Sequence, residues 1–167
     1  MYRNKKLYII TVLLLILVVG IAYKIVNTTS NNQDKIKVEL AKCVDGDTAW
    51  FSMNGEDKKA RFLYIDTPES TNQIEAYGKE ASNYTCEALS NADAIYLEYN
   101  PEGARQDKYG RELVWVFVDG ELLQERLAME GYVEAFYDYG VAYLYKDLII
   151  SANEQAKQNK VGIYSDE

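Results

Sequence analysis

Two acidic motifs carry residue types that could bind a metal ion and activate water. They are VDGDT, with Asp45 and Asp47, and DTPE, with Asp66 and Glu69. The sequence between them predicts a hairpin with its turn at residues 55–56, which places Asp66 opposite Asp45 to within two residues. Carboxylates gathered in this way repel one another unless a cation neutralises them. Oxygen ligands alone favour calcium or magnesium. For either motif by itself, an acidic turn facing water is the simpler interpretation.

Two arginines elsewhere in the sequence could bind phosphate. Arg61 lies in the otherwise apolar segment ARFLYI, where a guanidinium is costly unless it is paired or reaches a polar cleft. Arg111 follows Lys108 and Tyr109 in DKYGRE, which alone would indicate only a charged turn. A hard cation, arginine and a carboxylate base together suit the hydrolysis of a phosphate ester. Arg61 and Asp66 would lie about 16 Å apart on an extended strand, so this hypothesis requires the chain to bend between them.

The composition excludes several catalytic systems. The chain has 167 residues and no histidine, so Ser-His-Asp and Cys-His catalysis and histidine-ligated zinc are absent. Its two cysteines, Cys43 and Cys86, are too few to indicate a disulfide framework. We therefore expect two free thiols.

The N-terminal segment predicts a membrane anchor. Residues 1–26 begin with the basic MYRNKK and continue into an apolar segment which, taken from Leu7 to Val26, has 20 residues, about 30 Å of helix. The basic residues place the N-terminus inside the cell and the rest of the protein outside the cytoplasm. A signal peptide cleaved near Ala22, giving a secreted protein, is the alternative. Residues 27–34 are expected to form a polar linker, and residues 35–167 one folded domain.

The remaining sequence alternates strand and helix patterns. Strands are predicted at 36–40, 47–53, 60–65, 94–100 and 112–118, with a short further strand in YVEAF, 132–136. Helices are predicted at 77–92, 122–131 and 143–157. The inward side chains of the last helix are expected to be Leu144, Leu148, Ile149, Ala152 and Ala156. Five strands with interspersed helices fit a small α+β barrel.

Taken together, the motifs resemble the staphylococcal nuclease (thermonuclease) family. The similarity extends from about residue 36 to residue 165 and rests on VDGDT, RFLYIDTPE, YGKEA, DKYGR, EGYVEAFYDY and NEQAKQNKVGIYS in that order. It implies a five-stranded OB-fold barrel with three helices, here preceded by the predicted transmembrane helix. It also implies calcium-dependent hydrolysis of DNA and RNA to 3′-phosphate products, with flexible or single-stranded segments favoured. We expect a monomer.

The resemblance also implies a metal site and a base. Asp47 and Asp66 would bind calcium through their carboxylates, and Thr67 would offer its backbone carbonyl. Glu69 would act as general base or orient the attacking water. Asp45 is interpreted as a turn residue that supports the metal ligands.

Substrate contacts are implied for six further residues. Arg61 and Arg111 would hold the scissile phosphate, and Arg111 would assist the departing 5′-oxygen. The neighbouring phosphate and the nucleotide pocket would be contacted by Lys108, Tyr109, Tyr137 and Tyr139.

Three features depart from the family pattern. The segment 69–77 is short, and Glu134 stands where the well-known nuclease is basic. Residues 29–167 hold 14 basic and 26 acidic residues, a formal charge of −12. Because non-specific affinity for nucleic acid depends on cations, weak and salt-sensitive binding is expected. A non-catalytic OB-fold module and an acidic calcium-binding surface protein are the alternatives, but both arginines and Glu69 are present, which favours the enzyme.

Overall fold

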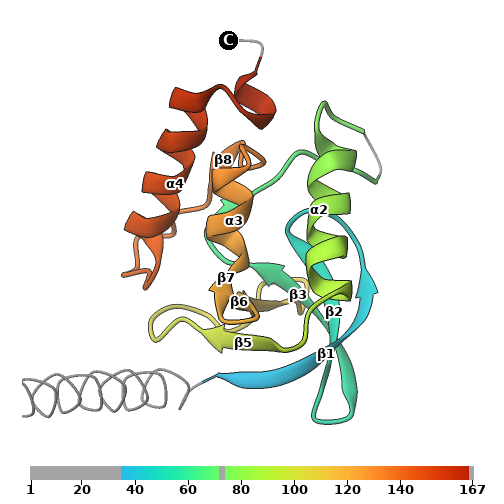
Figure 1. The fold of residues 1–167 in the computed structure, drawn as a ribbon. Coiled ribbons are helices and arrows are strands. Elements are labelled where there is room, and N and C mark those ends of the chain that lie inside the picture. Colours follow the sequence, from blue (N-terminus) through green and yellow to red (C-terminus); the bar gives the residue numbers. More distant parts are fainter. Residues whose placement is uncertain (1–34, 72–73, 166–167) are drawn as a thin grey trace, which may run out of the picture. The chain divides into compact units, whose positions relative to one another are not determined.

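Residues 35–71 and 74–165 are described by the structure, which is a computed structural model (Figure 1). The predicted anchor, 1–26, and linker, 27–34, lie outside the described residues. Lys35–Glu167 forms a single compact unit. Within the described ranges, no helix combines the length and apolar character needed to cross a membrane.

Five strands close into a barrel. The main sheet contains β1 (Ile36–Cys43), β2 (Thr48–Met53), β3 (Glu56–Phe62), β5 (Ile95–Tyr99) and β6 (Glu112–Val118), with the short β7 (Glu121–Leu122) beside β6. Its order is β3-β2-β1-β5-β6-β7, and a parallel pairing of β3 with β6 closes the barrel. A separate two-stranded ribbon joins β4 (Ile65–Asp66) to β8 (Ala135–Phe136). The predicted five-stranded α+β barrel is confirmed.

The β2–β3 hairpin brings the two acidic motifs together. Its two-residue turn is Asn54-Gly55, and both residues have positive φ, as a type I′ turn requires. The turn lies one residue earlier than the sequence predicted, so Thr48 pairs with Arg61. The Phe62 N–H then donates to the Asp47 carbonyl at 2.8 Å. Asp47 of VDGDT therefore lies beside the end of β3, and the chain continues from β3 into DTPE.

Three helices pack beside the barrel (Figure 1). They are α2 (Gly78–Ser90), α3 (Leu123–Met129) and α4 (Lys146–Asn159), and a short 3₁₀ helix, η1 (Gly162–Tyr164), follows α4. Helix α3 contacts both of the other helices. As expected, α4 buries Ile149, Ala152 and Ala156.

Two residues expected on the buried side of the last helix are exposed instead. Leu144 is 49% exposed and Leu148 is 44% exposed. Helix α4 begins only at Lys146, so Leu144 belongs to the preceding loop. Leu148 lies about 100° around the helix from Ile149, which turns it away from the buried side.

Cys43 and Cys86 form a disulfide, with Cα atoms 5.6 Å apart. The prediction of two free thiols is therefore wrong. The number of cysteines carries no information on their proximity, which arises because α2 packs against the end of β1. Beside the disulfide, the Thr85 hydroxyl donates to the Gly46 carbonyl at 2.7 Å. Both contacts hold the VDGDT segment against α2.

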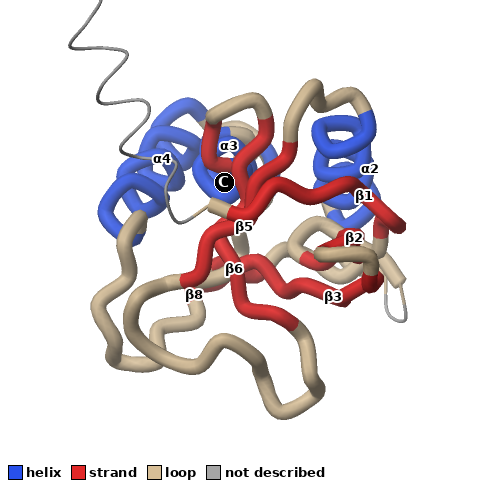
Figure 2. The backbone as a smooth tube through the Cα atoms, turned by 90° about the horizontal axis from the view of Figure 1, so that it is seen from below, coloured by secondary structure: helices blue, strands red, loops and turns tan. Residues whose placement is uncertain are grey.

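Two long loops lie together away from α2 and α3 (Figure 2). Residues 100–111 connect β5 to β6, and residues 137–145 connect β8 to α4. The Asn100 amide joins them, since it donates to the Ala142 carbonyl at 2.8 Å and accepts from the Leu144 N–H at 3.1 Å. These loops supply much of one wall of the site described next.

Candidate active site

A cleft of about 810 Å³ collects nearly all of the predicted site residues. It is lined by Asp47, Arg61, Asp66, Glu69, Lys108, Tyr109, Arg111, Tyr137 and Tyr139. Thr67, the tenth residue, is buried beside Asp66. Residues predicted from four separate motifs therefore meet at one surface.

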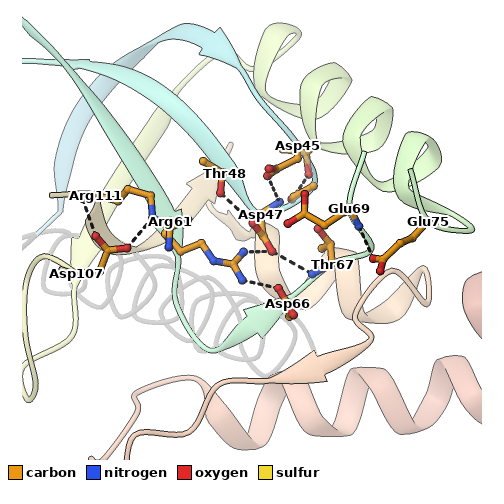
Figure 3. Close-up of polar contacts among 12 residues, drawn as sticks. Asp45, Asp47, Thr48, Arg61, Asp66, Thr67, Glu69, Glu75, Asp107 and Arg111 are labelled. Atoms are coloured by element: carbon orange, nitrogen blue, oxygen red, sulfur yellow. Dashed lines mark hydrogen bonds and ion pairs between the residues drawn. The ribbon is translucent and has the colours of Figure 1, made fainter. Parts of the chain in front are cut away.

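Arg61 lies between two carboxylates (Figure 3). Its side chain is only 10% exposed, Nη2 donates to Asp66 Oδ1 at 2.6 Å, and Nη1 forms an ion pair with Asp47. Nη1 is buried and has no hydrogen-bond partner of good geometry among the described residues. The chain bends at Leu63–Tyr64, where Tyr64 has a φ of 72°, and this bend returns Asp66 to Arg61. The bend that the sequence required is present.

Asp47 is held by donors from both motifs. The Thr48 hydroxyl donates to Oδ1 and the Thr67 N–H donates to Oδ2, each at 3.0 Å. Gly46 permits this contact, because a Cβ there would lie 2.5 Å from the Thr67 hydroxyl oxygen. A side chain at position 46 would push the two motifs apart.

Asp45 supports this arrangement from the turn. Its Oδ1 accepts a hydrogen bond from the Asp47 N–H at 3.3 Å. Burial raises the pKa of Asp45, and the nearby Arg61 guanidinium partly counteracts that rise. The structure therefore agrees with its interpretation as a turn residue.

Glu69 presents an unrestrained carboxylate to the cleft. Its backbone is fixed, because its N–H donates to the Glu75 carboxylate at 2.8 Å and its carbonyl accepts from the Glu75 N–H at 2.9 Å. The Glu69 side chain is exposed, and its carboxylate makes no hydrogen bond within the described part of the chain. It is therefore free to contact water in the cleft.

Arg111 is oriented by Asp107 (Figure 3). Arg111 Nε donates to Asp107 Oδ2 at 2.6 Å, and its backbone N–H donates to Oδ1 at 3.0 Å. Burial opposes ionisation of Asp107, but the hydrogen bonds from Arg111 and Tyr109 outweigh it and lower the pKa of this carboxyl group. The loop therefore carries an anionic residue that positions Arg111, while Lys108 and Tyr109 remain exposed.

Two tyrosines of the 137–145 loop also line the cleft. The Tyr137 and Tyr139 rings stack with centroids 6.3 Å apart and an interplanar angle of 16°. The Arg61 guanidinium lies 5.5 Å from the Tyr137 ring centroid. Both rings are solvent-exposed, so this pair offers a flat aromatic surface next to the buried guanidinium.

Glu134 adds a further negative charge near the carboxylates. Its N–H donates to the Asp66 carbonyl at 3.0 Å. Burial is the main cause of the raised pKa of Glu134, followed by the charges of Glu75, Asp66 and Glu69. The acidic departure noted in the sequence therefore lies close to Asp66 and Glu69, although Glu134 does not line the cleft.

The comparison with protein families decides the classification. The model for "Staphylococcal nuclease homologue" matches residues 59–166. The chain belongs to the staphylococcal nuclease family. The resemblance inferred from the motifs is thus confirmed.

Three relatives illustrate this membership of the staphylococcal nuclease family. Endonuclease YncB of Bacillus subtilis (strain 168) is 38% identical over 140 residues, covering 81% of this chain and 65% of the relative. The SPbeta prophage-derived endonuclease YokF of the same strain is 38% identical over 136 residues, covering 80% of this chain and 45% of the relative. The thermonuclease of Staphylococcus hyicus is 33% identical over 138 residues, covering 81% of this chain and 79% of the relative. The chain spans less than two thirds of the two Bacillus relatives.

The oxygen donors at this site are of the chemical type that a hard cation binds. Asp47 and Asp66 already contact one positive charge, the Arg61 guanidinium, so both carboxylates can serve a single cation. Calcium accepts carboxylate and carbonyl oxygens, which includes the backbone carbonyl of Thr67. Among the described residues, however, no three Asp, Glu, Cys or His side chains are grouped closely enough to hold a metal ion. The donor set is therefore limited to two carboxylates and carbonyl oxygen.

Sequence reasoning missed the partners that orient two site residues. Asp107 fixes Arg111, and Glu75 fixes the backbone of Glu69. The four-residue spacing of Asp107 and Arg111 in one predicted turn could have indicated the first pair. For Glu75 we find no comparable signal in the sequence.

Proposed function

We propose that this chain is a calcium-dependent nuclease that hydrolyses phosphodiester bonds of DNA and RNA and leaves 3′-phosphate products. The observation that carries the proposal is the single cleft in which two arginines, an unrestrained glutamate and two carboxylates meet. The names of the endonuclease and thermonuclease relatives support the same activity.

Arg61 and Arg111 would bind the scissile phosphate from two sides of the cleft. Guanidinium groups bind phosphate oxygens through paired N–H donors. The Arg61 guanidinium lines the cleft, where Asp47 and Asp66 fix its orientation toward a bound phosphate. Arg111 would stabilise the departing 5′-oxygen while Asp107 holds its guanidinium in place.

Glu69 would take the proton from the attacking water or orient that water. Its carboxylate lines the cleft while its backbone is fixed by Glu75. General-base catalysis by such a group typically contributes about 10²- to 10⁴-fold to the rate. A fixed backbone and an unpaired carboxylate suit a base that must act on water next to a bound phosphate.

Asp47, Asp66 and the Thr67 carbonyl would hold calcium. A bound calcium ion would supply positive charge that stabilises the phosphoryl oxygens during attack. The Thr67 N–H and the Thr48 hydroxyl keep the Asp47 carboxylate in a fixed orientation. These two hydrogen bonds would therefore orient the Asp47 carboxylate for binding the ion.

Single-stranded or flexible substrates suit the cleft best. The stacked Tyr137 and Tyr139 rings present a face to a nucleobase, and Lys108 and Tyr109 would contact the neighbouring phosphate. A base can reach aromatic rings only when it is not paired in a duplex. The formal charge of −12 over residues 29–167 predicts weak binding of a polyanion, which is strongest at low salt.

An extracytoplasmic location remains part of the proposal. The Cys43–Cys86 disulfide supports it, because disulfides persist mainly in oxidising compartments. Anchoring by residues 1–26, or secretion after cleavage near Ala22, is a proposal that the N-terminal sequence alone motivates. A monomeric state is a separate proposal.

The test is cleavage of single-stranded DNA and of RNA by the full chain at low salt, with calcium and then with a chelator. Calcium-dependent cleavage to products that end in 3′-phosphate is expected. Glu69→Gln should lower kcat by about 10²- to 10⁴-fold, whereas Glu80→Gln, on the exposed side of α2, is the matched control. Absence of cleavage of both nucleic acids would defeat the proposal, and binding without cleavage would favour a non-catalytic module.

A further inference from the structure

A second cavity of about 480 Å³ lies beside the cleft, and the proposed chemistry does not use it. The two cavities share Gln106, Tyr109 and Arg111 of the 100–111 loop. The second cavity extends from that loop to Trp50 on β2 and to Lys59 on β3. It is thus a continuation of the cleft beyond Arg111.

The cavity exists because β3 and β6 pair over only part of their length. Their parallel pairing begins where Ala60 faces Glu112. The preceding residues of β3, Lys58 and Lys59, have no partner in β6, and they face the 100–111 loop across the cavity. The open edge leaves room for an extended ligand.

A row of three side chains crosses the sheet, and two of them, Trp50 and Lys59, line this cavity. Lys42 of β1 is paired with Trp50 of β2, and Trp50 is paired with Lys59 of β3. Directly opposite residues on antiparallel strands share a face, and neighbouring strands lie about 4.8 Å apart. Trp50 therefore stands between two lysines on one face, and we name Lys42, Trp50 and Lys59 the tryptophan row.

The charges near the row leave two lysines available to an anion. Glu112 lines the cavity, but its side chain is only 5% exposed and lies 3.9 Å from the Lys58 ammonium. Lys42 and Lys59 form no ion pair with any residue in the described ranges. Asp57 is the remaining acidic residue of the cavity lining, and outside the lining the charge of Asp45 interacts with Lys59 without forming an ion pair. The lysines of the row therefore form a local positive site on an acidic domain.

Cations that flank an aromatic ring are the chemistry by which proteins bind single-stranded nucleic acid without reading its sequence. We propose that a single strand leaving the cleft passes Arg111 and continues onto the tryptophan row. A base would stack on Trp50, and adjacent phosphates would contact Lys42 and Lys59. This inference rests on the proposed nuclease function. It explains how a domain with so much negative charge retains a polyanionic substrate.

The test compares a short and a long substrate. The full chain, kept in detergent, would be assayed for kcat/KM on tetrathymidylate and dodecathymidylate, and the long-to-short ratio would be measured. Trp50→Ala should lower this ratio by about 5- to 150-fold, the range for loss of one stacked base. The double variant Lys42→Gln/Lys59→Gln should lower it too and should flatten the salt dependence of the long substrate by about 1.4 in log–log slope.

Lys37→Gln is the matched control. Lys37 is also exposed on β1, but it pairs with Tyr96 of β5, away from Trp50. Trp50→Phe keeps an aromatic face and should preserve the ratio. If Trp50→Ala fails to fold, the double lysine variant decides by itself, since both side chains lie on the outside of the sheet.

The outcomes separate this inference from the proposed function. Cleavage of both substrates with a ratio that neither the Trp50 nor the lysine variants change would overturn the tryptophan row and leave the nuclease function intact. If neither substrate is cleaved, the nuclease function fails. Binding of fluorescent dodecathymidylate then tests the row directly. Weaker binding by the variants supports the row, and unchanged binding overturns it.

Discussion

Removal of the Cys43–Cys86 disulfide tests how firmly the VDGDT segment is held. We consider the double variant Cys43→Ser/Cys86→Ser. The two cysteines are separated by 43 positions in the sequence. The loop-entropy relation for a cross-link of this span gives about 4 kcal/mol of stabilisation at 25 °C. The variant should therefore lose about 4 kcal/mol of unfolding free energy, which corresponds to a decrease in Tm of roughly 10–15 °C for a domain of this size.

The assay is urea unfolding of oxidised protein, reduced protein and the double variant. Reduction of the wild-type protein should reproduce the loss, and the double variant should not respond to the reductant. Below the melting transition the variant should retain its cleft, because the Thr85 hydroxyl still binds the Gly46 carbonyl. A loss below about 1 kcal/mol would refute the loop-entropy argument for this cross-link. A response of the double variant to reductant would show that another group is responsible.

Three further changes test the site. Arg61→Lys should lower kcat by about 10²- to 10³-fold in a steady-state cleavage assay, because one ammonium cannot reproduce the forked contacts to Asp47 and Asp66. Glu134→Lys should raise kcat/KM several-fold at low salt and steepen the log–log salt slope by about 0.7, because it adds one phosphate-neutralising cation to the acidic rim. Asp107 has a lowered pKa in the folded state. Its stabilisation is therefore fully present above the unfolded pKa of about 3.9 and is lost as the pH falls through the lower folded pKa. Asp107→Asn should therefore lower the free energy of unfolding near neutral pH, and this loss should become smaller as the pH falls below about 3.9. Urea unfolding at a series of pH values measures it.

Each of these changes has a matched control on a half-buried or exposed residue that does not line the cleft. They are Arg126→Lys, Glu87→Lys and Asp93→Asn. Full activity of Arg61→Lys would remove that guanidinium from the proposed mechanism. An unchanged salt slope for Glu134→Lys would mean that position 134 does not meet the substrate. A deficit for Asp107→Asn that stays constant down to pH 2 would contradict the assigned direction of its pKa.

Much of the fold could be predicted because its signals are local. Asn54-Gly55 specifies a tight turn, and the flanking alternation defines two strands, so the convergence of VDGDT with DTPE followed from a few residues of sequence. The exact register did not follow, because sequence alone placed the turn one residue late. The burial of Leu144 and Leu148 was mispredicted for a similar reason, since the starting residue of α4 decides which face turns inward.

The site divides in the same way between local and distant information. By itself, the sequence determined the chemistry: no histidine, several carboxylates in two motifs, two arginines in strand contexts, and a family resemblance that the comparisons confirmed. Only the tertiary structure decided which of these residues contact one another. The bend at Leu63–Tyr64 lets Arg61 reach Asp66, and the packing of α2 on β1 joins Cys43 to Cys86. The cavity at Trp50 is open because β3 does not pair with β6 before Ala60. Such contacts depend on how separate elements pack, and no short segment of the chain encodes that packing.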